Sequence, residues 1–134
     1  MRRLIMFAAF MSLNTCAATA ADAVDCRNAT STYEMNVCAD EDFSVADAAL
    51  NAAYQAALTK IKGQDAPAPY DAKAYEAAFR AAQRAWVAFR NADCGGVVPF
   101  EWTGGSGTTA AVLGCMVSKT ETRTKELSLS FGPQ

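Results

Sequence analysis

Residues 83–94 read Gln83-Arg84-Ala85-Trp86-Val87-Ala88-Phe89-Arg90-Asn91-Ala92-Asp93-Cys94. Trp86, Phe89 and Arg90 are three and four positions apart, so they share one face of a helix, and Asp93 follows on that face. We predict that Trp86, Phe89 and Arg90 belong to the structural core. A buried arginine is costly unless it is paired. We therefore expect Arg90 to stack on Trp86 and to pair with an acid, the candidates being Glu34, Asp47 and Asp93. The alternative is that Arg90 contacts a ligand.

Outward from this stretch, apolar residues recur every three or four positions, which predicts three helices at about residues 32–62, 72–92 and 109–128. Ser31 and Glu34 form a capping box, and Gly63 is a natural stop. A kink is conceivable near Asp42–Ser44. The middle helix begins after Asp71, and its expected buried positions are Tyr75, Phe79, Ala82, Trp86, Phe89 and Asp93. Together these patterns predict an all-α, up-down-up bundle.

The connection between the second and third helices is glycine-rich and carries Phe100 and Trp102. We expect Cys94-Gly95-Gly96 to end the middle helix. Large aromatics are mostly buried, so a lid over the bundle is the favoured interpretation, while presentation for binding is the alternative. Thr108 or Thr109 is the expected cap of the third helix. Gly114 inside that helix suggests close approach of a neighbouring backbone.

The first residues have the organisation of an export signal. Arg2 and Arg3 precede an apolar region of ten residues, Leu4 to Leu13, and an Ala-x-Ala site ends at Ala20. We predict a signal peptide at 1–20 and a single domain at 21–134, with no transmembrane segment after cleavage. Whether Cys16 carries a lipid is open. Cleavage leaves four cysteines, whose even number in a small exported domain predicts two disulfides with three possible pairings.

Composition excludes several functions. The chain has no histidine, and no cysteine pair has metal-binding spacing, so we expect no metal, no cofactor and no catalytic residues. Removing Arg2 and Arg3 leaves 10 basic against 14 acidic residues, a net charge of −4. This charge disfavours nucleic acid and favours a basic protein partner. The acidic turn Asp40-Glu41-Asp42 is either solvated helix surface or a docking patch.

Several blocks, in order and with the cysteines, resemble the LprI-like lysozyme-inhibitor family. The blocks are Glu34-Met35-Asn36-x-Cys38, Ala46-Asp47-x-x-Leu50-Asn51-x-x-Tyr54, Gln83-Arg84-Ala85-Trp86-x-x-Phe89-Arg90-x-Ala92-x-Cys94, Gly104-Gly105 and Cys115 with Thr120 and Arg123. The resemblance implies an exported helical domain with paired cysteines and, from the family's namesake activity, inhibition of lysozyme.

From these observations we expect a periplasmic or secreted binding protein, not an enzyme. It would inhibit lysozyme-type peptidoglycan hydrolases by occlusion, with a basic lysozyme as a protein partner. The alternative is an envelope binding or assembly domain with another target. The candidate binding residues are Asp40, Glu41, Asp42, Phe100 and Trp102. For the disulfides we predict the sequence-local pairs Cys26–Cys38 and Cys94–Cys115.

Overall fold

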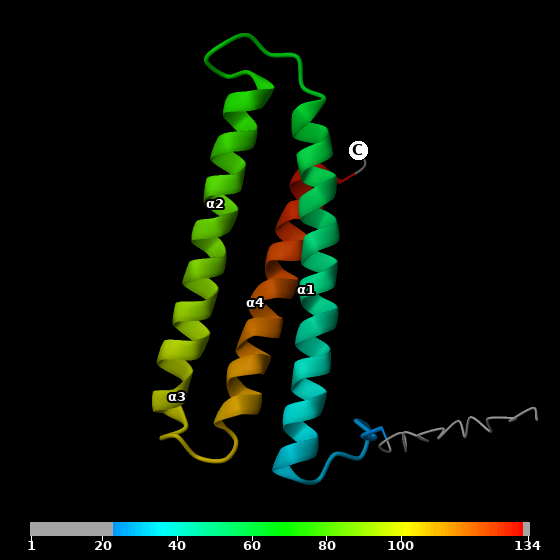
Figure 1. Ribbon diagram of the computed structural model, residues 1–134, viewed down its shortest axis with the longest axis vertical. Helices are drawn as coiled ribbons and strands as arrows, with labels where there is room; N and C mark the ends of the chain where they lie inside the picture. Colours follow the sequence, from blue (N-terminus) through cyan, green and yellow to red (C-terminus); the bar gives the residue numbers. More distant parts are fainter. Residues whose placement is uncertain (1–22, 133–134) are drawn as a thin grey trace, which may run out of the picture.

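The computed structural model describes residues 23–132, so the predicted signal peptide lies outside the described residues. Three long helices run up, down and up (Figure 1). They are α1 (Thr32–Lys62), α2 (Ala72–Ala92) and α4 (Thr108–Phe131), and a short helix, α3 (Val98–Glu101), lies at the lower turn. The expected all-α bundle is confirmed. None of the helices in residues 23–132 combines the length and apolar character needed to cross a bilayer.

Helix α1 begins and ends at the residues that its sequence predicts. Ser31 accepts a hydrogen bond from the Glu34 backbone N–H, and the Glu34 side chain accepts one from the Ser31 N–H in return. Gly63 follows the last turn as the C-cap. The helix is unbroken through Asp42–Ser44, so the kink considered from the sequence does not occur.

The core lies where α1, α2 and α4 meet toward the upper half of the bundle. Its buried members are Leu50, Ala57, Leu58, Ile61, Phe79 and Leu127. The Phe79 ring stacks on Tyr54, with centroids 5.4 Å apart, and meets the edge of Phe131 at 5.3 Å. These aromatic contacts hold the first helix, the second helix and the end of the chain together.

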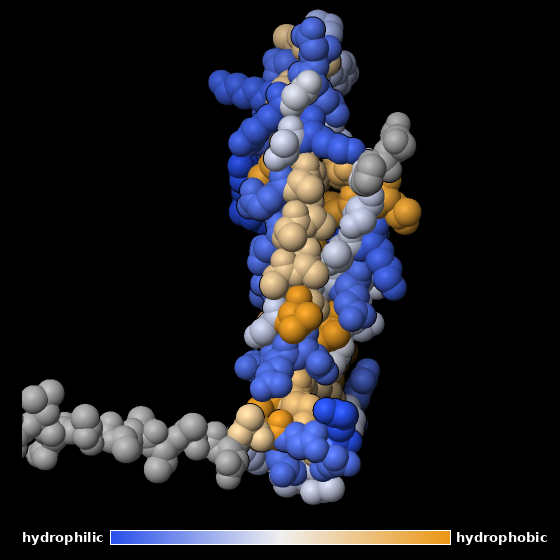
Figure 2. Space-filling view, turned by 90° about the vertical axis from the view of Figure 1, so that its right-hand side faces the viewer, coloured by the Kyte–Doolittle hydropathy of each residue, from blue (hydrophilic) through white to orange (hydrophobic). Residues whose placement is uncertain are grey.

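The outer face of α1 carries small apolar side chains that are not part of this core. Figure 2 shows a column of weakly hydrophobic surface flanked by hydrophilic groups. Val45 is 72% exposed, and the exposed alanines of α1 include Ala49, Ala52 and Ala56. Alanines at such positions support the helix through intrinsic propensity rather than through burial.

Helix α2 ends at Ala92, as the sequence predicts, but the chain does not open into a loop at Cys94-Gly95-Gly96. The chain continues through a π-helical segment, η1 (Asp93–Val97), directly into α3. Glycine lowers helix stability but does not forbid helical backbone angles. The chain turns later, at Thr103 and Gly104, whose φ values are 51° and 68°.

Two smaller expectations about α4 are also wrong. Its N-cap is Gly107, and no side chain caps it. The Thr108 hydroxyl instead donates to the Gly105 carbonyl at 2.7 Å. A Cβ atom on Gly114 would meet nothing within 4 Å, so no backbone packs closely there.

Candidate functional site: the disulfide-braced end of the bundle

The lower end of the bundle is held by a disulfide between α4 and the π-helical segment. Cys94 is fully buried and bonds to Cys115, 21 positions later. The second disulfide joins Cys26 to Cys38 and ties the segment before α1 back onto that helix. Both predicted pairings are confirmed. The chain between Cys94 and Cys115, which includes α3, is therefore anchored at both of its ends.

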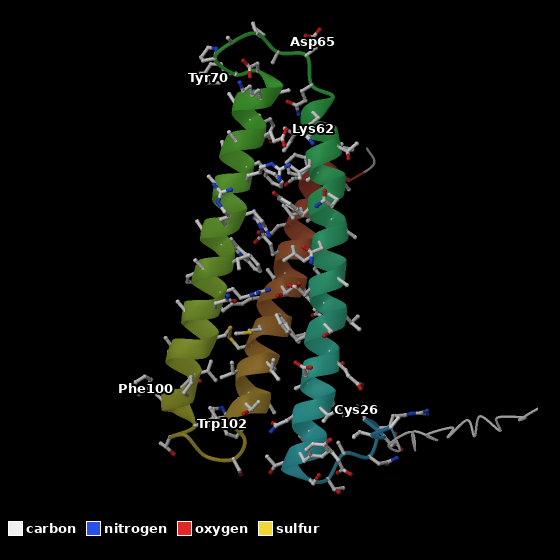
Figure 3. All side chains as sticks on the ribbon, in the orientation of Figure 1. Cys26, Lys62, Asp65, Tyr70, Phe100 and Trp102 are labelled. Carbon is white, nitrogen blue, oxygen red and sulfur yellow. A yellow bond between two sulfur atoms is a disulfide. The ribbon has the colours of Figure 1, made fainter. Side chains whose placement is uncertain are left out.

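The braced segment presents apolar side chains to solvent. Phe100 is 82% exposed and Trp102 is 49% exposed, so the expectation of a buried lid is wrong. Val97, nearby on η1, is 52% exposed. Figure 3 shows Phe100 and Trp102 at the lower end of the molecule.

The Trp102 ring is held in place by its own loop. Its six-membered ring lies against the α-carbon of Gly107, where a Cβ atom would collide with Cζ3 and Cε3. The Trp102 carbonyl also accepts a hydrogen bond of 2.9 Å from the Gly105 N–H. Glycine at position 107 thus makes room for the indole, and the half-exposed ring has a defined position.

The acidic turn lies toward the same end of the molecule. Asp40, Glu41 and Asp42 are all exposed on α1. Oε2 of Glu41 lies 3.6 Å from Sγ of Cys26, a contact and not a hydrogen bond because the disulfide sulfur carries no proton. In Figure 3, Cys26 and the loop aromatics lie on opposite sides of the same end. The structure therefore keeps the two candidate patches separate.

Arg90 is buried, paired with an acid and stacked on Trp86, as predicted from the sequence. It is 6% exposed, and its Nη1 donates to Asp47 at 3.2 Å and to Thr120 at 2.9 Å. Its guanidinium lies over the rings of Phe43, at 5.1 Å, and Trp86, at 5.3 Å. Of the three candidate acids, the structure selects Asp47. The contacts of Arg90 join all three long helices.

Phe89, expected in the core, is instead 56% exposed. Lys119 Nζ lies 5.0 Å from the centre of its ring and also pairs with Asp93 at 2.9 Å. Trp86 is only partly buried, against the edge of the core. The face of α2 that is buried is therefore rotated away from the apolar stripe, and it carries Phe79, Gln83 and Arg90.

Polar residues on this buried face were missed by the sequence analysis. The Gln83 side chain accepts a 3.1 Å hydrogen bond from Arg123 of α4. Arg80 donates to the Tyr54 hydroxyl at 3.2 Å and pairs with Glu76 at 2.7 Å. The hydrogen bond from Arg80 lowers the pKa of Glu76, although burial opposes the shift. The sequence does contain a signal for this face, because positions 76, 80, 83, 87, 90 and 94 recur at helical steps of four and three.

Metal-ligating residue types come together at one place in residues 23–132. A carboxylate oxygen of Asp93 and the sulfurs of Cys94 and Cys115 lie within 4.8 Å of one another. Both sulfurs are consumed by the disulfide, so a single carboxylate remains. This arrangement is not a metal site, because a bound ion needs several free ligands.

Comparison with known proteins assigns the chain to a family. Residues 25–127, nearly all of the described bundle, match the family described as lysozyme inhibitor LprI. The chain belongs to the LprI family. The match includes all four disulfide cysteines, Arg90 and the braced loop. The description of this family names inhibition of lysozyme.

A curated relative supports the same assignment. The uncharacterised protein R02472 of Rhizobium meliloti (strain 1021) is 39% identical over 106 residues, which cover 77% of this chain and 76% of that protein. No solved structure matches the chain.

Proposed function

We propose that this LprI-family protein inhibits lysozyme-type peptidoglycan hydrolases by placing the braced loop over the active-site cleft of the target. It needs neither catalysis nor a cofactor for this role. The observation that carries the proposal is the outward position of Phe100 and Trp102 on a segment anchored by a disulfide. The family's description supplies the class of target.

Exposed aromatics on a braced segment suit an inhibitor. Aromatic anchors supply much of the binding energy at protein interfaces when a partner pocket desolvates them. Phe100 is largely exposed, and Trp102 is about half exposed. The disulfide and the packing of Trp102 on Gly107 restrict the loop before binding. Less conformational entropy is then lost when the complex forms.

The acidic turn contributes to the approach of a basic target. The chain has a formal net charge of −2, which becomes −4 once the predicted signal is removed. Asp40, Glu41 and Asp42 add an exposed negative patch toward the loop end of the bundle. Such charges act mainly on the association rate, and salt screens them.

We also propose that the mature protein is periplasmic or secreted. The predicted signal peptide at 1–20 would export it, and the two disulfides suit an oxidising compartment. This location would place the inhibitor where it can meet hydrolases that attack the cell wall.

The test is an inhibition assay with the purified mature protein, a basic lysozyme and a suspension of cell walls. We expect slower lysis with the wild-type protein. Phe100→Ala and Trp102→Ala should each raise the inhibition constant at least about tenfold, as loss of an interface anchor does. Tyr70→Ala is the matched control, because Tyr70 is 81% exposed at the opposite end of the bundle (Figure 3).

Three results would contradict the proposal. Lysis at its normal rate in a large molar excess of protein would remove lysozyme as the target. Equal loss of inhibition in Tyr70→Ala and Trp102→Ala would remove the loop as the binding surface. Breakdown of cell walls by the protein alone would show that it is an enzyme.

A further inference from the structure

A cleft that several polar and charged side chains line lies between α1 and α2, away from the braced loop. Its volume is about 440 Å³. Leu50 and Val87 provide apolar contact in its wall. The polar side chains that line it and enter the argument are Asn51, Tyr54, Arg80, Gln83, Arg84 and Arg90. Figure 3 shows nitrogen-bearing side chains reaching from α2 across the space toward α1 and α4.

The cleft is cationic on a protein that is acidic overall. Three guanidinium groups and one carboxylate, that of Asp47, line it, while the whole chain has a net charge of −2. Arg80 is neutralised by Glu76 at 2.7 Å, and Arg90 by Asp47 at 3.2 Å. Arg84 is exposed and forms no ion pair with any of residues 23–132. One positive charge therefore remains uncompensated.

Arg90 is buried, but one of its guanidinium nitrogens, Nη2, makes no hydrogen bond with residues 23–132. Its Nη1 and Nε donate to Asp47, Thr120 and Asn91, and its Nη2 donates to no residue in the described range. In that range, Asn36 Oδ1 is the one buried side-chain polar atom without a partner. Nη2 is therefore accessible to solvent, although Arg90 as a whole is 6% exposed. Packing on Phe43 and Trp86 fixes the direction of this donor.

Neutral hydrogen-bonding groups complete the wall. The Tyr54 hydroxyl accepts from Arg80 at 3.2 Å, which leaves its own proton to donate. The Asn51 amide nitrogen donates to Asp47 at 3.1 Å, which leaves its carbonyl oxygen to accept. A ligand in the cleft would therefore meet fixed cations, one hydroxyl donor, one amide acceptor and apolar contact.

We propose that this cleft binds a small molecule through a single carboxylate. All of its cationic groups are arginines, whose planar donors match the two oxygens of a carboxylate. One uncompensated charge suits a monoanion and not a multiply charged phosphate. The volume is at the lower end of small-molecule sites, which suits a single sugar acid or an acylated amino acid.

The experiment is an NMR titration of the labelled, intact mature protein with three probes. They are N-acetylmuramic acid, N-acetylglucosamine, which lacks the lactyl carboxylate, and N-acetylalanine. We expect shifts at cleft residues with both acids and at least about tenfold weaker binding of N-acetylglucosamine, because a charge-assisted hydrogen bond is lost. Stronger binding of N-acetylmuramic acid than of N-acetylalanine identifies a sugar acid, and the reverse identifies an amino-acid carboxylate.

Two variants make the test specific. Arg84→Ala should weaken binding of both acids about tenfold, and it should fold normally because Arg84 is exposed and outside the core. Lys73→Ala removes an exposed cation of the same helix that does not line the cleft, so its affinity should not change. Absence of cleft shifts with either acid at about 10 mM would overturn the proposal. Unchanged affinity in Arg84→Ala would overturn it as well.

The proposal for the cleft and the proposal for the loop can be refuted independently of each other. The titration contains no lysozyme, so a negative result leaves inhibition by Phe100 and Trp102 untouched. Conversely, Phe100→Ala should keep the full affinity for the acids, because Phe100 does not line the cleft.

Discussion

Nη1 of Arg90 lies 3.2 Å from Oδ1 of Asp47, so one ion pair joins α2 to α1 across 43 positions of sequence. The arginine is buried, whereas the carboxylate side chain is 40% exposed. Water can therefore solvate the Asp47 carboxylate in part, but it can hardly solvate the buried Arg90 guanidinium. The stability of the joint therefore depends on keeping the guanidinium compensated.

We predict that Asp47→Ala lowers the free energy of unfolding by about 1–3 kcal/mol, because it leaves Arg90 buried with its charge uncompensated. The cost stays below that of a fully buried pair because Asp47 is partly solvated. The double variant Asp47→Ala/Arg90→Met should be more stable than Asp47→Ala alone. Urea unfolding curves of the wild-type protein and the two variants measure this. A double variant less stable than Asp47→Ala would show that the hydrogen bond to Thr120 matters more than the charge.

Two phenylalanines on α2 test which face is buried. Phe79→Ala should cost about 3–5 kcal/mol, because it removes a buried ring that contacts Tyr54 and Phe131. Phe89→Ala should cost less than about 1 kcal/mol, because Phe89 is 56% exposed and loses chiefly its contact with Lys119. Thermal and urea unfolding compare them directly. Equal costs would mean that α2 buries a different face.

Trp86→Ala should destabilise the bundle by about 3 kcal/mol, the lower end for a large aromatic, because Trp86 is only partly buried. The loss includes its face-on contact with Arg90. Trp86→Phe is the matched control and should recover most of the stability, since an aromatic face remains. Full stability of Trp86→Ala, with lost lysozyme inhibition, would instead make Trp86 a binding residue.

Acid should weaken the start of α1. Hydrogen bonds from the backbone N–H groups of Ser31 and Thr30 lower the pKa of Glu34 to about 2 from its ordinary value of 4.5. The stabilisation is thus present above about pH 4.5 and is lost as the pH falls toward 2. Glu34→Gln keeps an oxygen acceptor but cannot titrate, so its stability should fall less between pH 5 and about 2. Parallel pH curves of the unfolding midpoint would contradict this.

Removal of the Cys94–Cys115 disulfide tests the role of the loop brace separately from folding. Cys94→Ala/Cys115→Ala opens a loop of 21 positions and should cost about 3 kcal/mol of stability. We expect the helical circular dichroism to persist at low temperature while inhibition of lysozyme weakens, because the loop aromatics are no longer preorganised. Cys26→Ala/Cys38→Ala is the control, with a similar loss of stability and little loss of inhibition. Equal inhibition by both variants would show that bracing is not needed.

The sequence by itself determined the three long helices and the end of the first one at Gly63. Short-range physics decides these features: the capping box at Ser31 and Glu34, Asp71 before α2, and apolar residues at helical spacing. The close spacing of each cysteine pair along the chain also favoured the two disulfides that form. Each of these signals involves residues near one another in sequence, so it can be recognised without the fold.

Only the tertiary structure decided which face of α2 is buried and what the loop presents. Gln83 and Arg90 are buried because polar partners 40 and 43 positions away meet them, and hydrophobicity cannot anticipate such partners. Phe89 and Phe100 are exposed, although large aromatic side chains are mostly buried. Pairwise contacts between distant segments set burial, and those contacts exist only after the three helices have packed.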